Sequence, residues 1–70
     1  MIKTADFPHP ATCDVCSCEN ENVIVDGATR SGPWALMCAP CAVKEGVGLG
    51  VGKGQAYLWT AGAWTQTNPS

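Results

Sequence analysis

Short apolar runs alternate with polar and glycine-rich segments in the first part of the chain. Residues 22–26 and 33–38 combine β-branched, aliphatic and aromatic side chains, and the segment between them begins and ends with glycine. Strand-forming residues bounded by turn residues predict a β-hairpin. Pro40 then suits the first turn of a helix. We expect a short helix up to residue 45, with Gly46 as a left-handed C-terminal cap.

A second pair of apolar runs, residues 55–60 and 63–67, flanks Ala61-Gly62 and predicts another hairpin. A two-residue type I′ turn would force Ala61 to a positive φ angle. We therefore expect a type I turn in which Gly62 supplies a left-handed bulge. Residues 68–70 are expected to form a frayed end.

This turn fixes the expected register of the second hairpin. It pairs Trp59 with Ala63 and Leu58 with Trp64, which places the two tryptophans on opposite faces. One tryptophan should then join Trp34 and Tyr57 in the core. The more exposed one is a candidate anchor for a partner, because large aromatic side chains often dominate binding surfaces. Trp59 and Trp64 are both candidates for that role.

Glycine occupies every second position from residue 46 to residue 54. A phosphate-binding loop ending at Gly52-Lys53 would need glycine at Val47 and a hydroxyl residue at Gly54, so this motif is excluded, and the dinucleotide fingerprint fails in the same way. In an extended chain, the alternation would leave one face without side chains. The segment could pack that bare face against the first hairpin and point Val47, Leu49 and Val51 into the core.

The alternative is that the bare face is open. Gly48, Gly50 and Gly52 would then receive an extended segment of a partner or a phosphate group, with Lys53 at the rim. This alternative makes the glycine strip a candidate binding site.

The cysteines carry the clearest chemical signal. Cys13, Cys16, Cys38 and Cys41 form the pattern C-x2-C-x21-C-x2-C, which is typical of a tetrahedral site for one structural zinc ion. Two redox-active C-x-x-C motifs are the weaker alternative. Cys18 is expected to be a spare thiol, although a C-x-C arrangement could substitute it for Cys13. His9 is expected to be an ordinary loop histidine.

The spacing places one pair of cysteines before the first hairpin and the other at the start of the helix. A knuckle, a hairpin and a second knuckle that opens a helix follow the order of a treble clef. We therefore predict a small zinc-stabilised α+β fold of this type, followed by the second hairpin. A zinc ribbon is the alternative. The single domain, 1–70, would comprise an N-terminal arm (1–11), a zinc module (12–46), the glycine strip (47–54) and the C-terminal hairpin (55–67).

Charge and length limit the function classes. The 70 residues carry a formal net charge of −2, and four thiolates with one Zn²⁺ would lower it to −4. Four scattered cations give little affinity for phosphates, so nucleic-acid binding is the less favoured alternative. One histidine and a closed tetrathiolate site argue against an enzyme. The chain shows no signal peptide and no run of 18 apolar residues, so we expect a cytoplasmic protein without a membrane segment.

The segments GPWALMCAPC (residues 32–41) and GVGLGVGKGQ (residues 46–55) resemble those of small zinc-finger proteins encoded by tailed bacteriophages. The resemblance runs from Cys13 to about Trp64. It implies that the two C-x-x-C pairs are the zinc ligands and that the source is viral, and it implies no particular activity. Cys18 departs from the pattern. With the acidic charge and surplus aromatic residues, these features favour a protein-interaction module, such as a phage accessory factor that binds a host protein.

Overall fold

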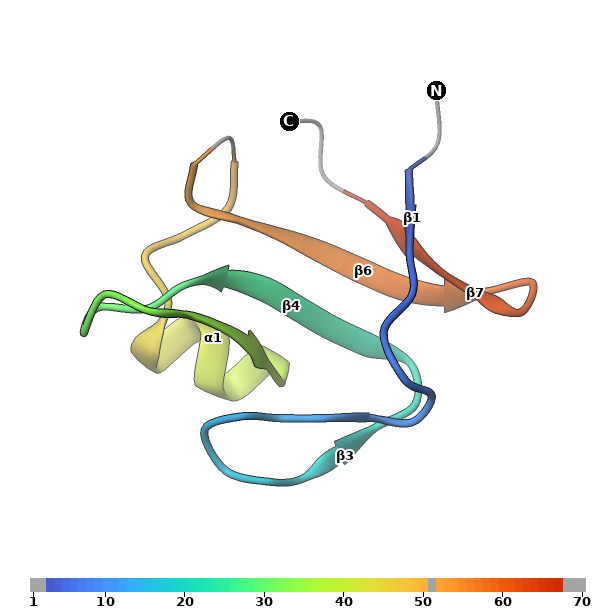
Figure 1. The fold of residues 1–70 in the computed structure, drawn as a ribbon, viewed down its shortest axis with the longest axis horizontal. Helices are drawn as coiled ribbons and strands as arrows, with labels where there is room; N and C mark the ends of the chain where they lie inside the picture. The colour runs from blue at the N-terminus through green and yellow to red at the C-terminus, as the bar shows by residue number, and fades with distance from the viewer. Residues whose placement is uncertain (1–2, 51, 68–70) are drawn as a thin grey trace.

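The computed structural model describes residues 3–50 and 52–67. This part of the chain forms a small α+β fold with one helix and two antiparallel sheets (Figure 1). The larger sheet has the strand order β1-β7-β6-β4-β5, and β2 pairs with β3 in the smaller one. The elements are β1 (Thr4–Ala5), β2 (Ala11–Thr12), β3 (Glu19–Asn20), β4 (Val23–Ala28), β5 (Trp34–Met37), α1 (Ala39–Glu45), β6 (Gly54–Thr60) and β7 (Ala63–Gln66).

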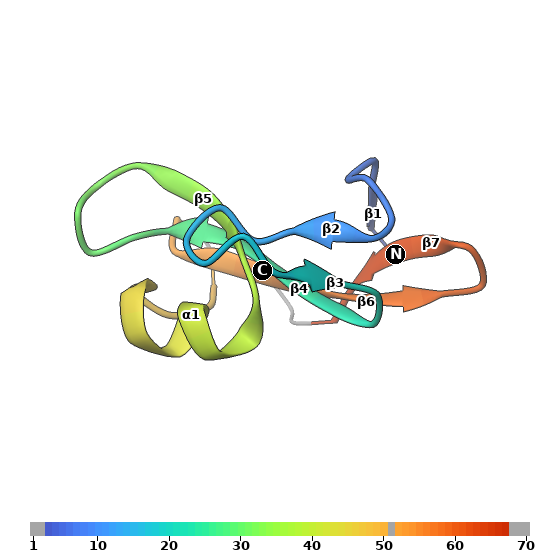
Figure 2. The ribbon, with the colours of Figure 1, turned by 90° about the horizontal axis from the view of Figure 1, so that it is seen from below.

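The two faces of the larger sheet are covered by different parts of the chain (Figure 2). On one face, Ile24 and Tyr57 are opposite each other on β4 and β6, and they pack with Ala11 and Trp64 in a buried cluster. The N-terminal segment, including β2, lies over this cluster. On the other face, Val25 is paired with Met37 of β5, and α1 packs there against both strands. Because successive side chains of β4 point to opposite faces of the sheet, this strand contributes to the packing on both faces.

The predicted elements are present with small shifts at their ends. The first hairpin is formed by β4 and β5, the second by β6 and β7, and the helix follows the first hairpin. The N-terminal arm also contains regular structure, because β1 pairs with β7 and β2 pairs with β3. The prediction of a frayed end at residues 68–70 lies outside the described residues. In the part of the chain that is described, no helix is long and apolar enough to cross a membrane.

The predicted turn of the second hairpin is wrong. Ala61 and Gly62 have φ angles of 52° and 81°, and Thr60 pairs with Ala63 across the turn. These are the features of a two-residue type I′ turn, whose twist matches that of the strands. Its register places Trp59 opposite Trp64, so both tryptophans lie on one face of the sheet. Ala61 therefore adopts the left-handed conformation, which is strained for a residue with a side chain, in the turn that gives this pairing.

Two further predictions about the core are corrected. Trp34 is 51% exposed because it lies at the start of the edge strand β5, whereas Tyr57 is buried as expected. Val47 and Leu49 are also about half exposed, so they do not point into the core. The same prediction for Val51 lies outside the described residues.

The glycine strip is not an extended strand with one bare face. Gly48, Gly50 and Gly52 have positive φ angles of 121°, 128° and 77°. Residues with a side chain rarely adopt such angles, and they differ from the negative φ of a β-strand, so the chain changes direction at these glycines. A Cβ atom on Gly50 or Gly52 would meet nothing within 4 Å. The expected packing of this face against the first hairpin is therefore wrong at these positions.

Close backbone approach does occur at Gly46, just before the strip, and at Gly54, its last residue. Gly46 has φ −79° and is extended, so the prediction of a left-handed cap is wrong. A Cβ atom there would lie 2.5 Å from the carbonyl oxygen of Ala42, and this lack of space explains the glycine. At the other end, Gly54 pairs with Gly27 across β6 and β4. The two glycines allow these strands to approach closely.

Candidate metal centre

The segment between β2 and β3 forms a tight knuckle around the sulfur of Cys13. The backbone N–H groups of Val15 and Cys16 both donate to Cys13 Sγ, at 3.4 Å. The chain then closes because Ser17 N donates to Cys13 O and Cys13 N donates to Cys18 O. Ser17 takes a positive φ of 66° in this turn. Backbone donors aimed at a sulfur stabilise it as a thiolate, the form that binds metals.

Asp14 holds the knuckle against the first hairpin. Its backbone N–H donates to the carbonyl oxygen of Leu36 at 2.7 Å, and its carboxylate accepts a hydrogen bond from Leu36 N at 2.9 Å. Leu36 belongs to β5, which ends one residue before Cys38. Cys38 precedes the first residue of α1. This docking brings the knuckle to the junction of β5 and α1.

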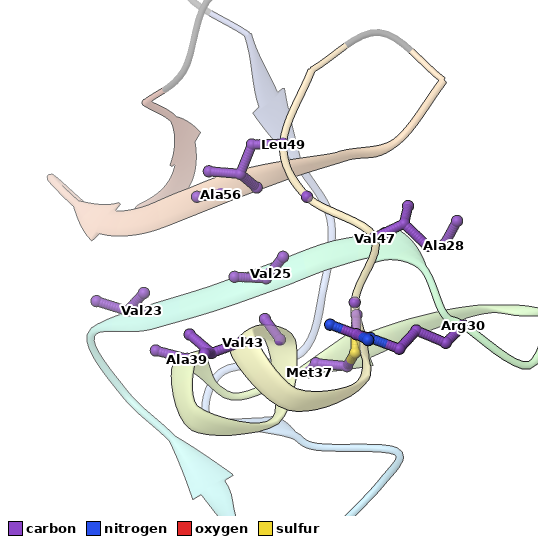
Figure 3. A pocket seen from close by; sticks show the side chains of 14 residues that line it. Val23, Val25, Ala28, Arg30, Met37, Ala39, Val43, Val47, Leu49 and Ala56 are labelled. Atoms are coloured by element: carbon purple, nitrogen blue, oxygen red, sulfur yellow. The ribbon is translucent and has the colours of Figure 1, made fainter.

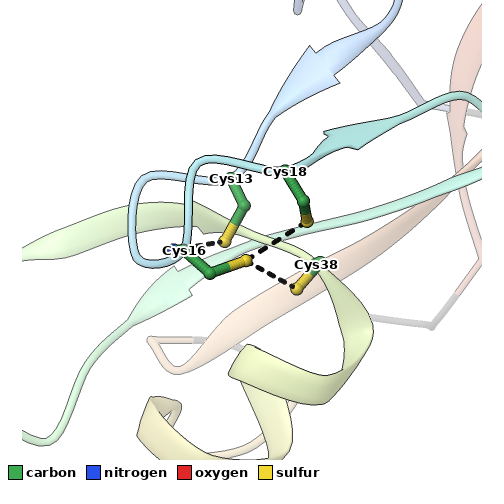
Figure 4. A group of neighbouring side chains, drawn as sticks. All are labelled: Cys13, Cys16, Cys18 and Cys38. Atoms are coloured by element: carbon green, nitrogen blue, oxygen red, sulfur yellow. Dashed lines mark hydrogen bonds between the residues drawn. The ribbon is translucent and has the colours of Figure 1, made fainter.

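Four sulfurs meet at this junction (Figure 4). The Sγ atoms of Cys13, Cys16, Cys18 and Cys38 all lie within 4.8 Å of one another. The Cys16–Cys38 distance is 3.7 Å and the Cys16–Cys18 distance is 3.2 Å. Four sulfurs at about 2.3 Å from one tetrahedral ion would be separated by about 3.8 Å. The group therefore fits a metal ion once Cys16 and Cys18 move apart by about half an ångström and the pairs that lie further apart, up to 4.8 Å, approach by up to about one ångström.

Cys41, the fourth predicted ligand, is not in the group of four, and Cys18, the predicted spare, is. Cys41 is nevertheless close, since it packs against the buried cluster of Cys13, Met37 and Cys38. All five thiols thus converge. Cys13, Cys16 and Cys38 are common to both possible tetrads, and the choice of the fourth ligand stays a prediction. The C-x-C spacing of Cys16 and Cys18 was the sequence signal that Cys18 could be a ligand, but it was interpreted as a substitute for Cys13, whereas the structure groups Cys18 with Cys13 and leaves out Cys41.

The thiols differ in how readily they ionise. Burial raises the pKa of Cys13, but hydrogen bonds from backbone N–H groups outweigh burial and lower the pKa to about 6. The backbone at Cys18, followed by the Cys18 thiol, lowers the pKa of Cys16. The neighbouring thiol of Cys16 raises the pKa of Cys18 to about 12, and that of Cys38 raises the pKa of Cys41. Neighbouring thiolates repel one another, so these thiols cannot all lose their protons unless a cation lies between them. Such a group is therefore suited to binding a metal ion.

The other predicted site residues lie elsewhere. Trp64 is buried, and its indole N–H donates to Pro8 O at 3.0 Å. Trp59 is half-buried, and the ring of His9 stacks on it at 3.7 Å with the planes 7° apart. His9 also contacts the carbonyl oxygen of Glu21 through Nε2, at 3.0 Å. Of the two candidate anchors, Trp59 is therefore the more exposed one, and the ring of His9 partly covers it.

Lys53 lies at the turn of the glycine strip. Its backbone N–H donates to Gly50 O, and its carbonyl oxygen accepts from Ala28 N. The residue is exposed, as are Gly48 and Gly52. The arrangement leaves these three positions accessible, and a partner-binding role for them stays a prediction.

The converging thiols are thus the feature of this chain with the clearest chemistry. They come from the knuckle, the end of β5 and the first turn of α1, and they can hold a metal ion. Comparisons with protein-family models, with curated proteins and with solved structures found no match for this chain.

Proposed function

We propose that this chain is a non-enzymatic protein-interaction module whose fold is held by one structural zinc ion. The observation that carries the proposal is the group of four thiols within 4.8 Å of one another. Zinc is the expected metal because tetrahedral thiolate sets are typical of structural zinc sites. Four protein ligands leave no position for a reactive water, so the ion would stabilise the fold.

The distribution of buried residues supports a structural role for the ion. One of the two core clusters consists of Cys13, Met37 and Cys38, with Cys41 and Ala42 packed against it. Two of its three buried members are therefore candidate ligands. A chain of this size has a marginal core, and a metal commonly supplies the missing stability. Zinc would join the knuckle to β5 and to α1, which has no buried residue of its own.

The order of elements supports a treble-clef-like interpretation of the zinc module. A knuckle between β2 and β3 is followed by the β4–β5 hairpin and then by Cys38 and Cys41 at the start of α1. In a zinc ribbon, a hairpin would replace the helix. The short α1 would depend on the ion, since a helix of seven residues is marginal alone.

Charge and exposed apolar side chains favour a protein as the partner. Zinc bound by four thiolates would make the already acidic chain more negative, which disfavours phosphate backbones. Val43, Trp34 and Leu49 are each at least half exposed and can contact apolar groups of a partner. The resemblance to small zinc-finger proteins of tailed bacteriophages supports a host protein as that partner, in the cytoplasm of an infected cell.

Metal content and cysteine variants test the structural part of the proposal. We expect one zinc per chain by elemental analysis of protein purified without added metal. Cys38→Ser should lose both zinc and the folded circular dichroism spectrum, because Cys38 belongs to both tetrads. If Cys41 is the fourth ligand, Cys18→Ser keeps zinc and Cys41→Ser weakens its binding; the reverse result assigns Cys18. A chain that folds fully with chelator present contradicts a structural ion.

The interaction part needs a separate experiment. Photo-crosslinking of the zinc-loaded chain in bacterial lysate should give discrete protein adducts, and gel shifts with duplex DNA and single-stranded RNA should show only weak, salt-sensitive binding. Tight nucleic-acid binding that persists at about 200 mM salt, without protein adducts, would favour the alternative of a nucleic-acid-binding zinc finger.

A further inference from the structure

An apolar groove lies on the face of the larger sheet that α1 only partly covers (Figure 3). Val23 and Val25 of β4 and Ala56 of β6 form its floor. Val43 of α1 and Leu49 of the glycine strip stand on opposite sides of it. These two side chains are 78% and 51% exposed. The hollow has a volume of about 500 Å³, enough for several aliphatic side chains.

One charge enters this groove. Among the described residues that line it, Arg30 is the only charged one, and it approaches from the end opposite Val23 (Figure 3). In the described part of the chain, no carboxylate pairs with its guanidinium group. An arginine beside an apolar surface favours a carboxylate, which its planar fork can bind with two hydrogen bonds.

The floor of the groove can contact an occupant through its side chains but not through unpaired backbone groups of β4. Strand β4 is paired on both sides, with β5 and with β6, so an occupant cannot add a strand there. Recognition must therefore come from apolar side chains that fill the hollow and from a carboxylate that reaches Arg30. A small molecule normally has most of its surface buried in its site, whereas the exposed rims at Val43 and Leu49 form a shallow groove. A polypeptide segment can cover such rims as well as the floor.

We propose that this groove binds a short segment of a partner protein in which apolar side chains stand next to an Asp, a Glu or a C-terminal carboxylate. The proposal rests on the function as an interaction module and names its contact surface. The floor strand has six residues, or about 20 Å at the usual rise of about 3.3 Å per residue. This length matches about six extended residues or about three to four turns of helix. The carboxylate lies at the Arg30 end.

Selection from a displayed library of random 12-residue peptides tests this surface with the full zinc-loaded chain as bait. Enriched peptides should carry at least two apolar residues within about five positions of an acidic group. Arg30→Glu should weaken their binding at least tenfold. Lys44→Glu makes the same charge change on exposed α1 without touching the groove, and it should leave binding unchanged. Val43→Asp, at a highly exposed position, should also abolish binding.

Zinc content and circular dichroism must match the parent chain for each variant that is compared. Peptides that bind equally well to Arg30→Glu and Val43→Asp would overturn the groove as the contact surface while leaving an interaction module intact. Enrichment of basic or purely apolar peptides, or of no peptides, would overturn the proposed partner chemistry. The crosslinking experiment in lysate tests separately whether the chain is an interaction module. A dimer by analytical ultracentrifugation that Arg30→Glu dissociates would identify a second copy as the occupant, which also contradicts the proposal.

Discussion

Substituting Gly54 by alanine probes the close contact that holds the end of the glycine strip against the sheet. A Cβ atom on Gly54 would lie 3.0 Å from Gly27 Cα, 3.1 Å from Gly48 O and 3.2 Å from Asp26 O. All three are backbone atoms, which cannot rotate away. Overpacking of this kind costs about 1–3 kcal/mol. Alanine recovers about 0.4–1 kcal/mol by restricting the unfolded chain, so the net loss is at most about 2.6 kcal/mol, and we expect about 1–2 kcal/mol, in the middle of the range.

Thermal melting with equal protein and zinc concentrations measures this loss, because bound metal shifts the midpoint. For a domain of this size, about 1–2 kcal/mol corresponds to a fall of about 4–16 °C. Gly50 provides the matched control, since its φ is 128° and a Cβ atom there has open space. Gly50→Ala should destabilise through backbone strain alone, and chemical synthesis with D-alanine at position 50 should remove that effect. A Gly54→Ala chain that melts at or above the parent temperature would refute the close approach.

Two further substitutions test the sheet. Burial, followed by the charge of Asp14, raises the pKa of Asp26 above its ordinary value of 3.8. The folded chain therefore binds this proton more tightly than the unfolded chain does. As a result, the free energy of unfolding falls as pH rises from about 3.8 through the folded-state pKa. Asp26→Asn should therefore raise the melting temperature at pH 7, and the gain over the parent at each pH should shrink as pH falls; a constant gain would contradict ionisation as the cause. Ala61→Asn should add about 1 kcal/mol in a denaturant titration, because asparagine tolerates the left-handed conformation of the type I′ turn. A loss of stability there would instead support the bulged turn.

The sequence was sufficient to predict where the main elements lie. The hairpin runs, the proline at the start of α1 and the cysteine spacing are local signals, and the described structure has strands and a helix at those positions. It was not sufficient for the register of the second hairpin. The conformational preference of Ala61 argued for a bulge, but the type I′ turn allows Trp59 to lie opposite Trp64, with ring centres 5.3 Å apart. Aromatic packing and strand twist therefore outweigh a single strained residue.

The prediction of an extended glycine strip was wrong for a related reason. Alternating glycines were interpreted as an extended segment, because period two is the pattern of a strand. Alternation is equally compatible with a chain that uses positive φ at every second residue, and the sequence contains nothing that separates the two. What the segment packs against is also non-local. Gly54 needs the absence of a side chain because Gly27, far away in sequence, lies opposite it.

The same distinction between local and non-local information explains the metal centre. The C-x-x-C spacing of the first pair fixes a knuckle through contacts within a few residues, such as the N–H groups of Val15 and Cys16 that point at Cys13. Which thiol would complete a metal-binding tetrad also depends on tertiary contacts, such as the one by which Asp14 docks the knuckle on β5, and this contact spans 22 residues. If the chain binds a metal ion, a shift of the knuckle relative to α1 would change which of Cys18 and Cys41 lies nearer to it, because Cys18 belongs to the knuckle and Cys41 to the helix. The identity of a fourth ligand would therefore depend on tertiary contacts such as the two Asp14–Leu36 hydrogen bonds, which the spacing of the cysteines does not reveal.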